Sequence, residues 1–201
     1  MRFVLFALFM IGAAMTAQAF TTPVTDKKRQ AVVQDVGKGF MAVAERLGFS
    51  HFAWGNVVQN GAVIVLEYLP DDKTKVESWN KMMTVTAYAL SGDPKQDVQI
   101  MGSIQGGLIK AYGTQGKIVQ TEYYTQGPDK YPAAFIEYKI GEGAQAEHNA
   151  GALIKPGAKL AAFIQTQCRG ACKALSAEEI AVVHSLVGGG GQNGAPAPQK
   201  K

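Results

Sequence analysis

The stretch from Phe52 to Pro70 constrains the fold more than any other, because it predicts a β-hairpin. It reads FAWGNVVQNGAVIVLEYLP, and Asn60-Gly61 separates two runs that are rich in β-branched residues. Both turn residues tolerate the positive φ angles of a two-residue type I′ turn, so this pair is the strongest short-range hairpin signal. Pro70 ends the second strand. The chain therefore contains antiparallel β-structure with a face to bury.

Five more segments are predicted to be strands, because they are rich in β-forming residues and bounded by turn residues. They are Trp79 to Leu90, Ile118 to Gln126, Tyr131 to Ile140, His148 to Ile154 and Leu160 to Gln167. Gly127-Pro128-Asp129 and Pro156-Gly157 separate the last four into two hairpins. Connections this short join antiparallel neighbours, so the sheet should be largely antiparallel.

Three other segments carry apolar residues at the spacing of a helical face. The first contains Val32, Val36, Phe40, Val43 and Leu47 and ends at Gly48; the second runs from Lys95 to Tyr112 with Val98, Met101, Ile104, Leu108 and Tyr112; the third contains Ile180, Val183, Leu186 and Val187. Ser176 and Glu179 form a capping box at the start of the third. The order of elements predicts one α+β domain over residues 20–187, a mostly antiparallel sheet covered by helices in an α/β/α sandwich.

Both ends of the chain are expected to lie outside this domain. Residues 1–19 have the features of a signal peptide: Arg2, an apolar stretch from Phe3 to Ala14 and the small-x-small site Ala17-Gln18-Ala19. An uncleaved anchor is the alternative. Cleavage would place the protein, beginning at Phe20, in the periplasm or outside the cell. Residues 188–201 are rich in Gly and Pro and predict a disordered tail.

The charge of the chain gives no sign of a nucleic-acid partner. The formal net charge is +4, and it falls to +3 when the signal peptide with its single Arg2 is removed. Lys27-Lys28-Arg29 is the one basic run of three, and a solvated helix face explains it. No arginines alternate with aromatic residues as they would on a nucleic-acid surface.

Cys168 and Cys172 are the only cysteines, and an exported compartment favours their oxidation to a structural disulfide. Gly170 would relieve strain in the short loop between them. Thioredoxin-like redox pairs have two intervening residues, whereas three lie between these cysteines. A redox-active pair remains an alternative, since Arg169 and Lys173 could lower a thiol pKa. Metal binding or free thiols are the third.

No other residues form a recognisable catalytic or metal-binding motif. The histidines, His51, His148 and His184, lack metal-ligand spacing, and no cofactor motif or nucleophile elbow occurs. Carboxylates of the predicted strands could approach one another across the sheet, although surface alternation explains them more simply; they are Glu67, Glu122 and Glu137. These observations predict a protein without catalytic activity, cofactor or metal.

Tyr123 and Tyr124 are the candidate contact residues. Neighbouring residues on a strand point to opposite sides of the sheet, so one of the two rings is expected to be exposed. An exposed aromatic ring beside Gly127-Pro128 could anchor a partner or line a pocket.

One passage of the sequence resembles the strand–loop–Trp–strand passage of PsbP-like proteins. It consists of Glu67-Tyr68-Leu69-Pro70, a polar gap, Trp79 and Met82 to Thr86, within a likeness that spans about Val57 to Leu186. The resemblance implies an α/β/α sandwich around an antiparallel sheet and the role of an exported accessory protein. It carries over no functional residue.

The resulting functional hypothesis is an exported, non-catalytic accessory protein that binds another protein in the cell envelope. One alternative is a periplasmic carrier of small molecules or lipids, with a pocket between the sheet and the helix Lys95–Tyr112, where Met82, Met83 and Met101 could leave room. The other is a thiol oxidoreductase.

Overall fold

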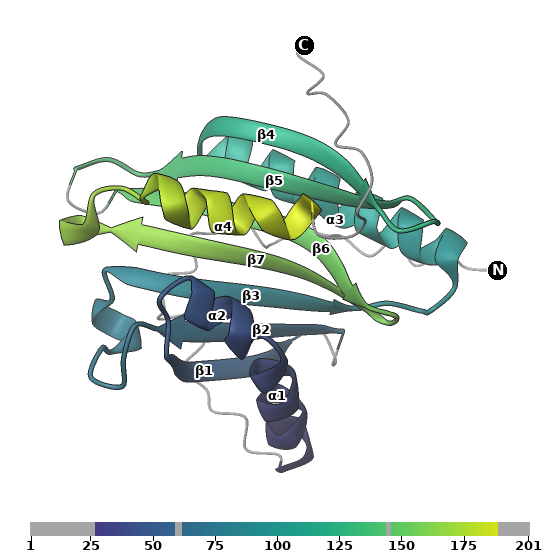
Figure 1. The fold of residues 1–201 in the computed structure, drawn as a ribbon, viewed down its shortest axis with the longest axis horizontal. Coiled ribbons are helices and arrows are strands. Elements are labelled where there is room, and N and C mark those ends of the chain that lie inside the picture. The colour runs from purple at the N-terminus through teal and green to yellow at the C-terminus, as the bar shows by residue number, and fades with distance from the viewer. Residues whose placement is uncertain (1–26, 59–61, 144–145, 189–201) are drawn as a thin grey trace.

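A seven-stranded antiparallel sheet forms the centre of the protein (Figure 1). The computed structural model describes residues 27–58, 62–143 and 146–188. The strands are β1 (His51–Val58), β2 (Val63–Leu69), β3 (Lys81–Ala89), β4 (Gly116–Gln126), β5 (Tyr131–Ile140), β6 (Glu147–Gly157) and β7 (Leu160–Arg169). They lie in the order β1-β2-β3-β7-β6-β5-β4, and every neighbouring pair is antiparallel. The predicted α+β class is confirmed.

The sheet is made of two meanders that meet in its middle. Strands β1 to β3 form the first meander and β4 to β7 the second, and β3 pairs with β7 from Lys81↔Cys168 to Ala89↔Leu160. The helix α3 (Pro94–Gln115) connects the meanders, since it carries the chain from β3 to the far edge, where β4 begins. Asp93 caps this helix, because its side chain accepts a hydrogen bond from the Gln96 N–H at 2.9 Å.

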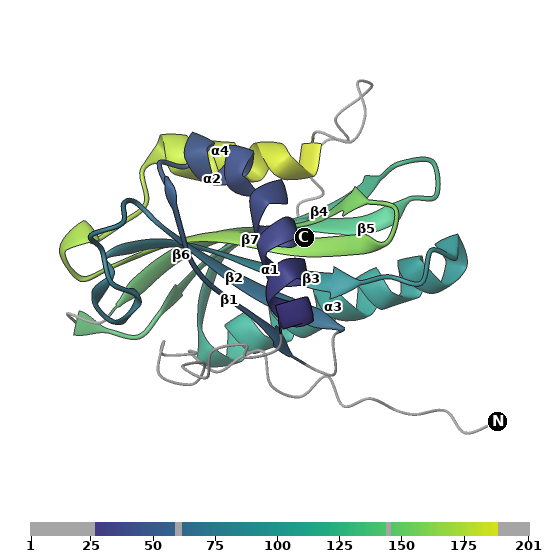
Figure 2. The same cartoon turned by 90° about the horizontal axis from the view of Figure 1, so that it is seen from below.

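Helices cover both faces of the sheet, which gives the expected three layers (Figure 2). The helices α1 (Lys27–Gly39), α2 (Met41–Arg46) and α4 (Ala177–Gly188) lie on one face, and α3 lies on the other. Two 3-10 turns, η3 (Val76–Ser78) and η5 (Gly170–Cys172), lie in connections at one end of the sheet. Each face buries its own hydrophobic cluster.

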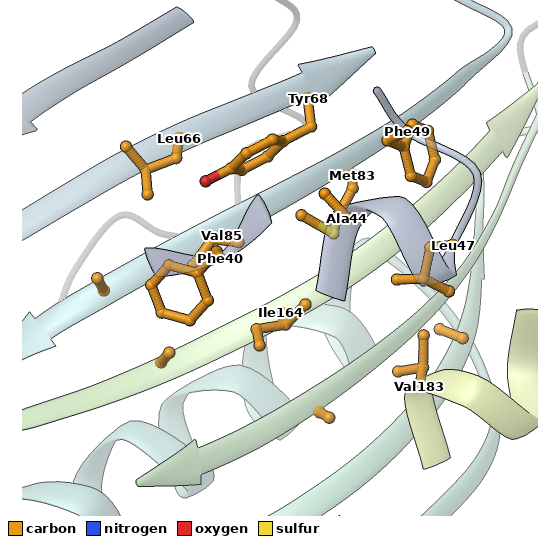
Figure 3. Close-up of a cluster of buried hydrophobic side chains, with 14 of the residues drawn as sticks. Phe40, Ala44, Leu47, Phe49, Leu66, Tyr68, Met83, Val85, Ile164 and Val183 are labelled. Atoms are coloured by element: carbon orange, nitrogen blue, oxygen red, sulfur yellow. The ribbon is translucent and has the colours of Figure 1, made fainter. Parts of the chain in front are cut away.

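The larger cluster lies beneath α1, α2 and α4 (Figure 3). Strand residues such as Leu66, Met83 and Val85 meet Ala44 of α2 and Val183 of α4 there, and all five are fully buried. Burying this many apolar side chains is the main favourable contribution to folding. α4 is also tied to β3, because the Lys81 Nζ donates to Glu179 Oε1 at 2.7 Å.

The predicted N-terminal helix is wrong in one respect, because the chain breaks at Phe40. α1 ends at Gly39, and α2 begins at Met41. Two glycines weaken the helix at this point, and the Tyr68 hydroxyl donates to the Gly37 carbonyl at 2.7 Å. The residues of α1 that face inward also differ from the expectation. Val32, expected in the core, is 49% exposed, and Val33 is buried in its place.

Some strand boundaries also differ from the prediction. β3 begins at Lys81, because Trp79 lies before it and is held by Arg169. β6 continues through Pro156 to Gly157, where the register with β7 shifts, so the turn lies at residues 158–159. A bulge accommodates a proline that a regular ladder would exclude.

Several predictions fall outside the described residues. They concern the signal peptide, the turn Asn60-Gly61 and residues 189–201 of the tail. The strands on both sides of that turn do pair as the hairpin predicts, from Val58↔Val63 to His51↔Leu69.

Candidate functional site

The two cysteines meet where the last strand turns toward the last helix. Their sulfur atoms are at bonding distance, and their Cα atoms are 5.5 Å apart. Cys168 is fully buried at the end of β7, and Cys172 is half-buried at the end of η5. Gly170 has a positive φ of 58°, which glycine adopts without strain. The burial of Cys168 makes it unsuited to be the attacking thiol of a redox pair, because that thiol must be accessible, whereas Cys172 is only half-buried.

We expect the double variant Cys168→Ala/Cys172→Ala to unfold at a lower temperature but to keep its biological activity. The loop between the cysteines is short, so the chain-entropy contribution of the bond is only about 2 kcal/mol. For a domain of this size that corresponds to roughly 4–8 °C in Tm. Thermal unfolding measures the change, and reduced wild-type protein is the control that should match. A loss of activity at unchanged stability would support the redox alternative instead.

His148 lies on β6 opposite Cys168 and hydrogen-bonds to the segment that leads into α4. Its Nδ1 accepts a hydrogen bond from the Leu175 N–H at 3.2 Å, so the ring proton lies on Nε2. Nε2 is 2.8 Å from Glu137 Oε1 and donates to it. The side chain is 8% exposed, and both ring nitrogens have partners. His148 is therefore a satisfied buried histidine that links β5, β6 and the entry to α4.

The two tyrosines of β4 point to opposite sides of the sheet, as expected. Tyr123 is 61% exposed, whereas Tyr124 is half-buried beneath α4. The Tyr124 hydroxyl lies 2.9 Å from His184 Nε2, and the two rings meet edge to face. Tyr124 is thus held by its own protein, while the ring of Tyr123 is available to another molecule.

Sequence reasoning missed the hydrogen-bonded cluster that Tyr124 forms with Glu122 and His184. Glu122 accepts hydrogen bonds from Tyr124 and Gln120, and His184 Nε2 lies 3.2 Å from Glu122 Oε2. Glu122 and Tyr124 share a face of β4 because they are two residues apart. His184, on α4, is brought to them by the fold. Two-residue spacing could have suggested the strand pair, but no sequence signal indicates the histidine.

The pKa shifts of Glu122 and Tyr124 favour the hydrogen bond between them. The hydrogen bond from Tyr124 lowers the pKa of Glu122, and burial opposes this effect. Hydrogen bonds from His184 and Gln120 lower the pKa further. Burial and the Glu122 carboxylate raise the pKa of Tyr124 to about 12. The phenol therefore keeps its proton and donates a hydrogen bond to the Glu122 carboxylate. A protonated tyrosine is no nucleophile, and no serine or cysteine belongs to the cluster.

On the face that α3 covers, the carboxyl group of Glu67 lies in a half-buried position. Burial raises the pKa of Glu67 to about 7, and the negative charge of Glu77 adds to the increase. Thr84 of β3 is its cross-strand neighbour. A carboxyl that titrates near neutral pH could exchange protons, but Glu67 and Glu137 lie on opposite faces and do not form the pair that an acid–base mechanism needs.

Asn149 is a further polar residue on this face. It is 1% exposed, and neither atom of its amide makes a hydrogen bond. Burial raises the pKa of the Glu147 carboxyl on the same face, and the positive charge of Arg169 opposes that increase. The Gln167 amide beside Asn149 donates to Thr84 Oγ1 at 2.8 Å. Burying an unsatisfied amide costs stability, and nothing in the sequence marks this position.

The space between the sheet and α3 is filled by side chains. Met101, Ile104, Leu108 and Tyr112 of α3 are all buried against the sheet. The Tyr112 ring stacks on Tyr138 with centroids 3.8 Å apart, and both hydroxyls donate to Gln165 Oε1. This packing weighs against the carrier pocket that the sequence suggested under this helix.

Residues 27–58, 62–143 and 146–188 contain no group of three or more His, Cys, Asp or Glu side chains that could hold a metal ion. Within the same ranges no helix is both long enough and apolar enough to cross a membrane. No protein-family model matches the chain, and no curated protein sequence does either.

Proposed function

We propose that this is an exported accessory protein, without catalytic activity, that binds another protein through the exposed edge of β4. The observation that carries the proposal is the position of Tyr123. It is a large aromatic side chain, 61% exposed, on a strand that pairs with β5 alone among the strands that the structure describes. Tyrosine is among the residues that most often dominate binding energy in interfaces.

The two halves of β4 differ in how well they are protected. A register shift between Ile118 and Gln120 disrupts the first half, and Lys117 adds a charge there. Bulges and lysines are the usual protection of an edge strand. The second half, residues 121–125, pairs regularly with β5, contains no lysine or proline, and carries Tyr123. This half of the edge is open to an added strand.

A partner would bind here by β-strand addition. An extended segment would pair with the free backbone groups of residues 121–125, and its side chains would contact Tyr123. The other face of β4 is already fixed, because Tyr124 and Glu122 hold His184 of α4. The strand would thus present a rigid edge, and rigidity lowers the entropic cost of binding.

Two further observations support the proposal. The cysteine pair at bonding distance suits an oxidising compartment, in agreement with the signal peptide that the sequence predicts. The resemblance to PsbP-like proteins implies an exported accessory role as well. A thiol oxidoreductase is less well supported, since Cys168 is fully buried, and a carrier is less well supported because α3 packs tightly on the sheet.

The test is site-specific photo-crosslinking in the cells that make the protein. We expect a photoreactive phenylalanine analogue at position 123 to give a discrete adduct with one other protein. The matched control is position 32, where Val32 is 49% exposed on α1, far along the chain from β4. Tyr123→Ser should weaken binding of the captured partner by roughly tenfold or more.

Three results would contradict the proposal. The same adducts at both positions would indicate non-specific contact. No adduct at position 123 would indicate that the edge is unused. An adduct with the mass of two copies of this chain would replace the foreign partner by self-association.

A further inference from the structure

A cavity of about 510 Å³ opens at the end of the sheet opposite the disulfide. It lies where the last turn of α4 meets the β4–β5 and β6–β7 hairpins and the end of α2. The residues that line it are Arg46, Gln126, Gly127, Tyr131, Ile154, Lys155, Pro156, Gly157, Ser185 and Leu186. Its volume is within the range of small-molecule sites, roughly 300–1,000 Å³.

The charged side chains that the structure places in the wall of this cavity are both positive. Arg46 and Lys155 are the charged side chains among the described residues that line it, and none of these residues carries a carboxylate. The Lys155 Nζ donates to the carbonyl oxygens of Gly157 at 3.0 Å and Ala158 at 2.9 Å, and it lies 4.4 Å from the centroid of the Tyr131 ring. All three partners are electrically neutral. The ammonium is therefore held in the wall without a counter-charge from any described residue.

Arg46 faces the same space from the end of α2. Its Nη2 donates to Ser185 Oγ at 3.3 Å, which brings the guanidinium beside α4. In the part of the chain that the structure describes, neither Arg46 nor Lys155 forms an ion pair with a carboxylate. A guanidinium offers several N–H donors in a planar fork that matches a carboxylate, and one hydrogen bond to serine leaves others available.

The C-terminal end of α4 lies at this cavity, and its partial negative charge would repel an anion less because Gln126 hydrogen-bonds to its last carbonyl groups. The carbonyl ends of a helix carry partial negative charge. Here the Gln126 Nε2 donates to the carbonyl oxygens of Leu186 and Val187 at 3.4 Å. The same amide accepts from the Lys155 N–H at 2.9 Å. Gln126 is buried, and both its amide nitrogen and its amide oxygen have hydrogen-bond partners within the protein, so it is a fixed part of the cavity wall.

We propose that this cavity binds a small amphiphilic carboxylate. The carboxylate would lie between Arg46 and Lys155, and an apolar group would pack against Ile154, Pro156 and Leu186. Two cations that no described carboxylate pairs with account for the anionic head, and the apolar walls account for the body. Tyr123 does not line the cavity, so this site is separate from the proposed protein-binding edge, and either can fail without the other.

The experiment titrates the full chain, after export, with sodium octanoate and follows the backbone amides by NMR. We expect saturable shifts centred on Gly127, Gly157 and Ser185. Octanol has the same apolar chain without the charge, so its affinity should be lower than that of octanoate by at least roughly tenfold. Arg46→Gln and Lys155→Gln should each weaken octanoate binding by roughly tenfold. Lys95→Gln, an exposed lysine of α3, is the matched control and should change nothing.

A second probe distinguishes the source of the carboxylate. N-acetyl-leucine also joins a carboxylate to an apolar group, but it resembles the C-terminus of a peptide. Tighter binding of octanoate would indicate a fatty acid, and tighter binding of N-acetyl-leucine would indicate a peptide C-terminus. Unfolding temperatures of the variants show whether each is folded. The proposal is overturned if neither probe saturates, if octanol binds as well as octanoate, or if the double variant Arg46→Gln/Lys155→Gln binds like wild type.

Discussion

Replacing His148 with leucine should lower the free energy of unfolding by about 3 kcal/mol. The imidazole satisfies two buried groups at once, the Leu175 N–H and the Glu137 carboxylate, whose side chain is 12% exposed. Leucine can serve neither. Removing one partner of a buried, hydrogen-bonded charge is costly because the charge that remains has lost its compensation. Urea denaturation, followed by circular dichroism, measures the change.

The double variant His148→Leu/Glu137→Leu provides the sharper comparison. If the cost comes from the uncompensated carboxylate, removing it as well should restore roughly half of the lost stability. The matched control is Lys139→Ala, an exposed side chain opposite His148, which should change the free energy of unfolding by less than about 0.5 kcal/mol. A double variant as unstable as the sum of the two single variants would show that packing around His148 matters, and not its hydrogen bonds.

Glu67→Gln should stabilise the protein at pH 8 by about 2–3 kcal/mol and have little effect at pH 4. Burial raises the folded-state pKa of Glu67 from 4.5 to about 7, and each unit corresponds to about 1.4 kcal/mol. The folded chain therefore holds a proton that the unfolded chain has released. Wild-type stability should fall as the pH rises from 4.5 to about 7, because folding must then bury a charge.

The measurement is the free energy of unfolding at several pH values between 4 and 8. The glutamine variant should lose the fall that wild type shows in this window. Glu142→Gln is the control, since Glu142 is exposed and pays no burial cost. Parallel curves for wild type and Glu67→Gln would show that water reaches this carboxyl in the folded protein.

Much of the sheet could be predicted because its signals are local. Turn residues marked the hairpins, and the predicted strand Tyr131 to Ile140 agrees with β5 at both ends. The capping box was also predicted correctly: the Ser176 N–H donates to Glu179 Oε2 at 2.8 Å, and the Glu179 N–H donates to Ser176 Oγ at 3.2 Å. These features depend on residues that are at most a few positions apart.

The errors arise where a distant contact decides the local structure. The N-terminal helix breaks near Gly37, whose carbonyl accepts a hydrogen bond from the Tyr68 hydroxyl of β2, and Val33 lies in the core where Val32 was expected. Trp79 precedes β3 because Arg169 donates to its carbonyl at 2.9 Å and stacks on its ring at 3.9 Å. Neither contact has a signature within its own segment.

The candidate sites divide in the same way. The close approach of Cys168 and Cys172 could be predicted from four residues of spacing, and the exposure of one β4 tyrosine from strand alternation. The cavity could not, because Arg46 and Lys155 belong to elements that meet only after the sheet is complete. The same holds for His184, which α4 brings to β4 after the chain has passed through three further strands.

The pairing of β3 with β7 has a consequence for how the chain folds. β3 is finished before α3 begins, yet its second neighbour is the last strand to be made. Until β7 arrives, β3 presents an open edge of nine residues, Lys81–Ala89, at the centre of the future sheet. Contacts this distant in sequence form slowly, and an open edge invites pairing with other chains. The newly made chain is therefore most vulnerable to aggregation in the interval before this central strand gains its second partner.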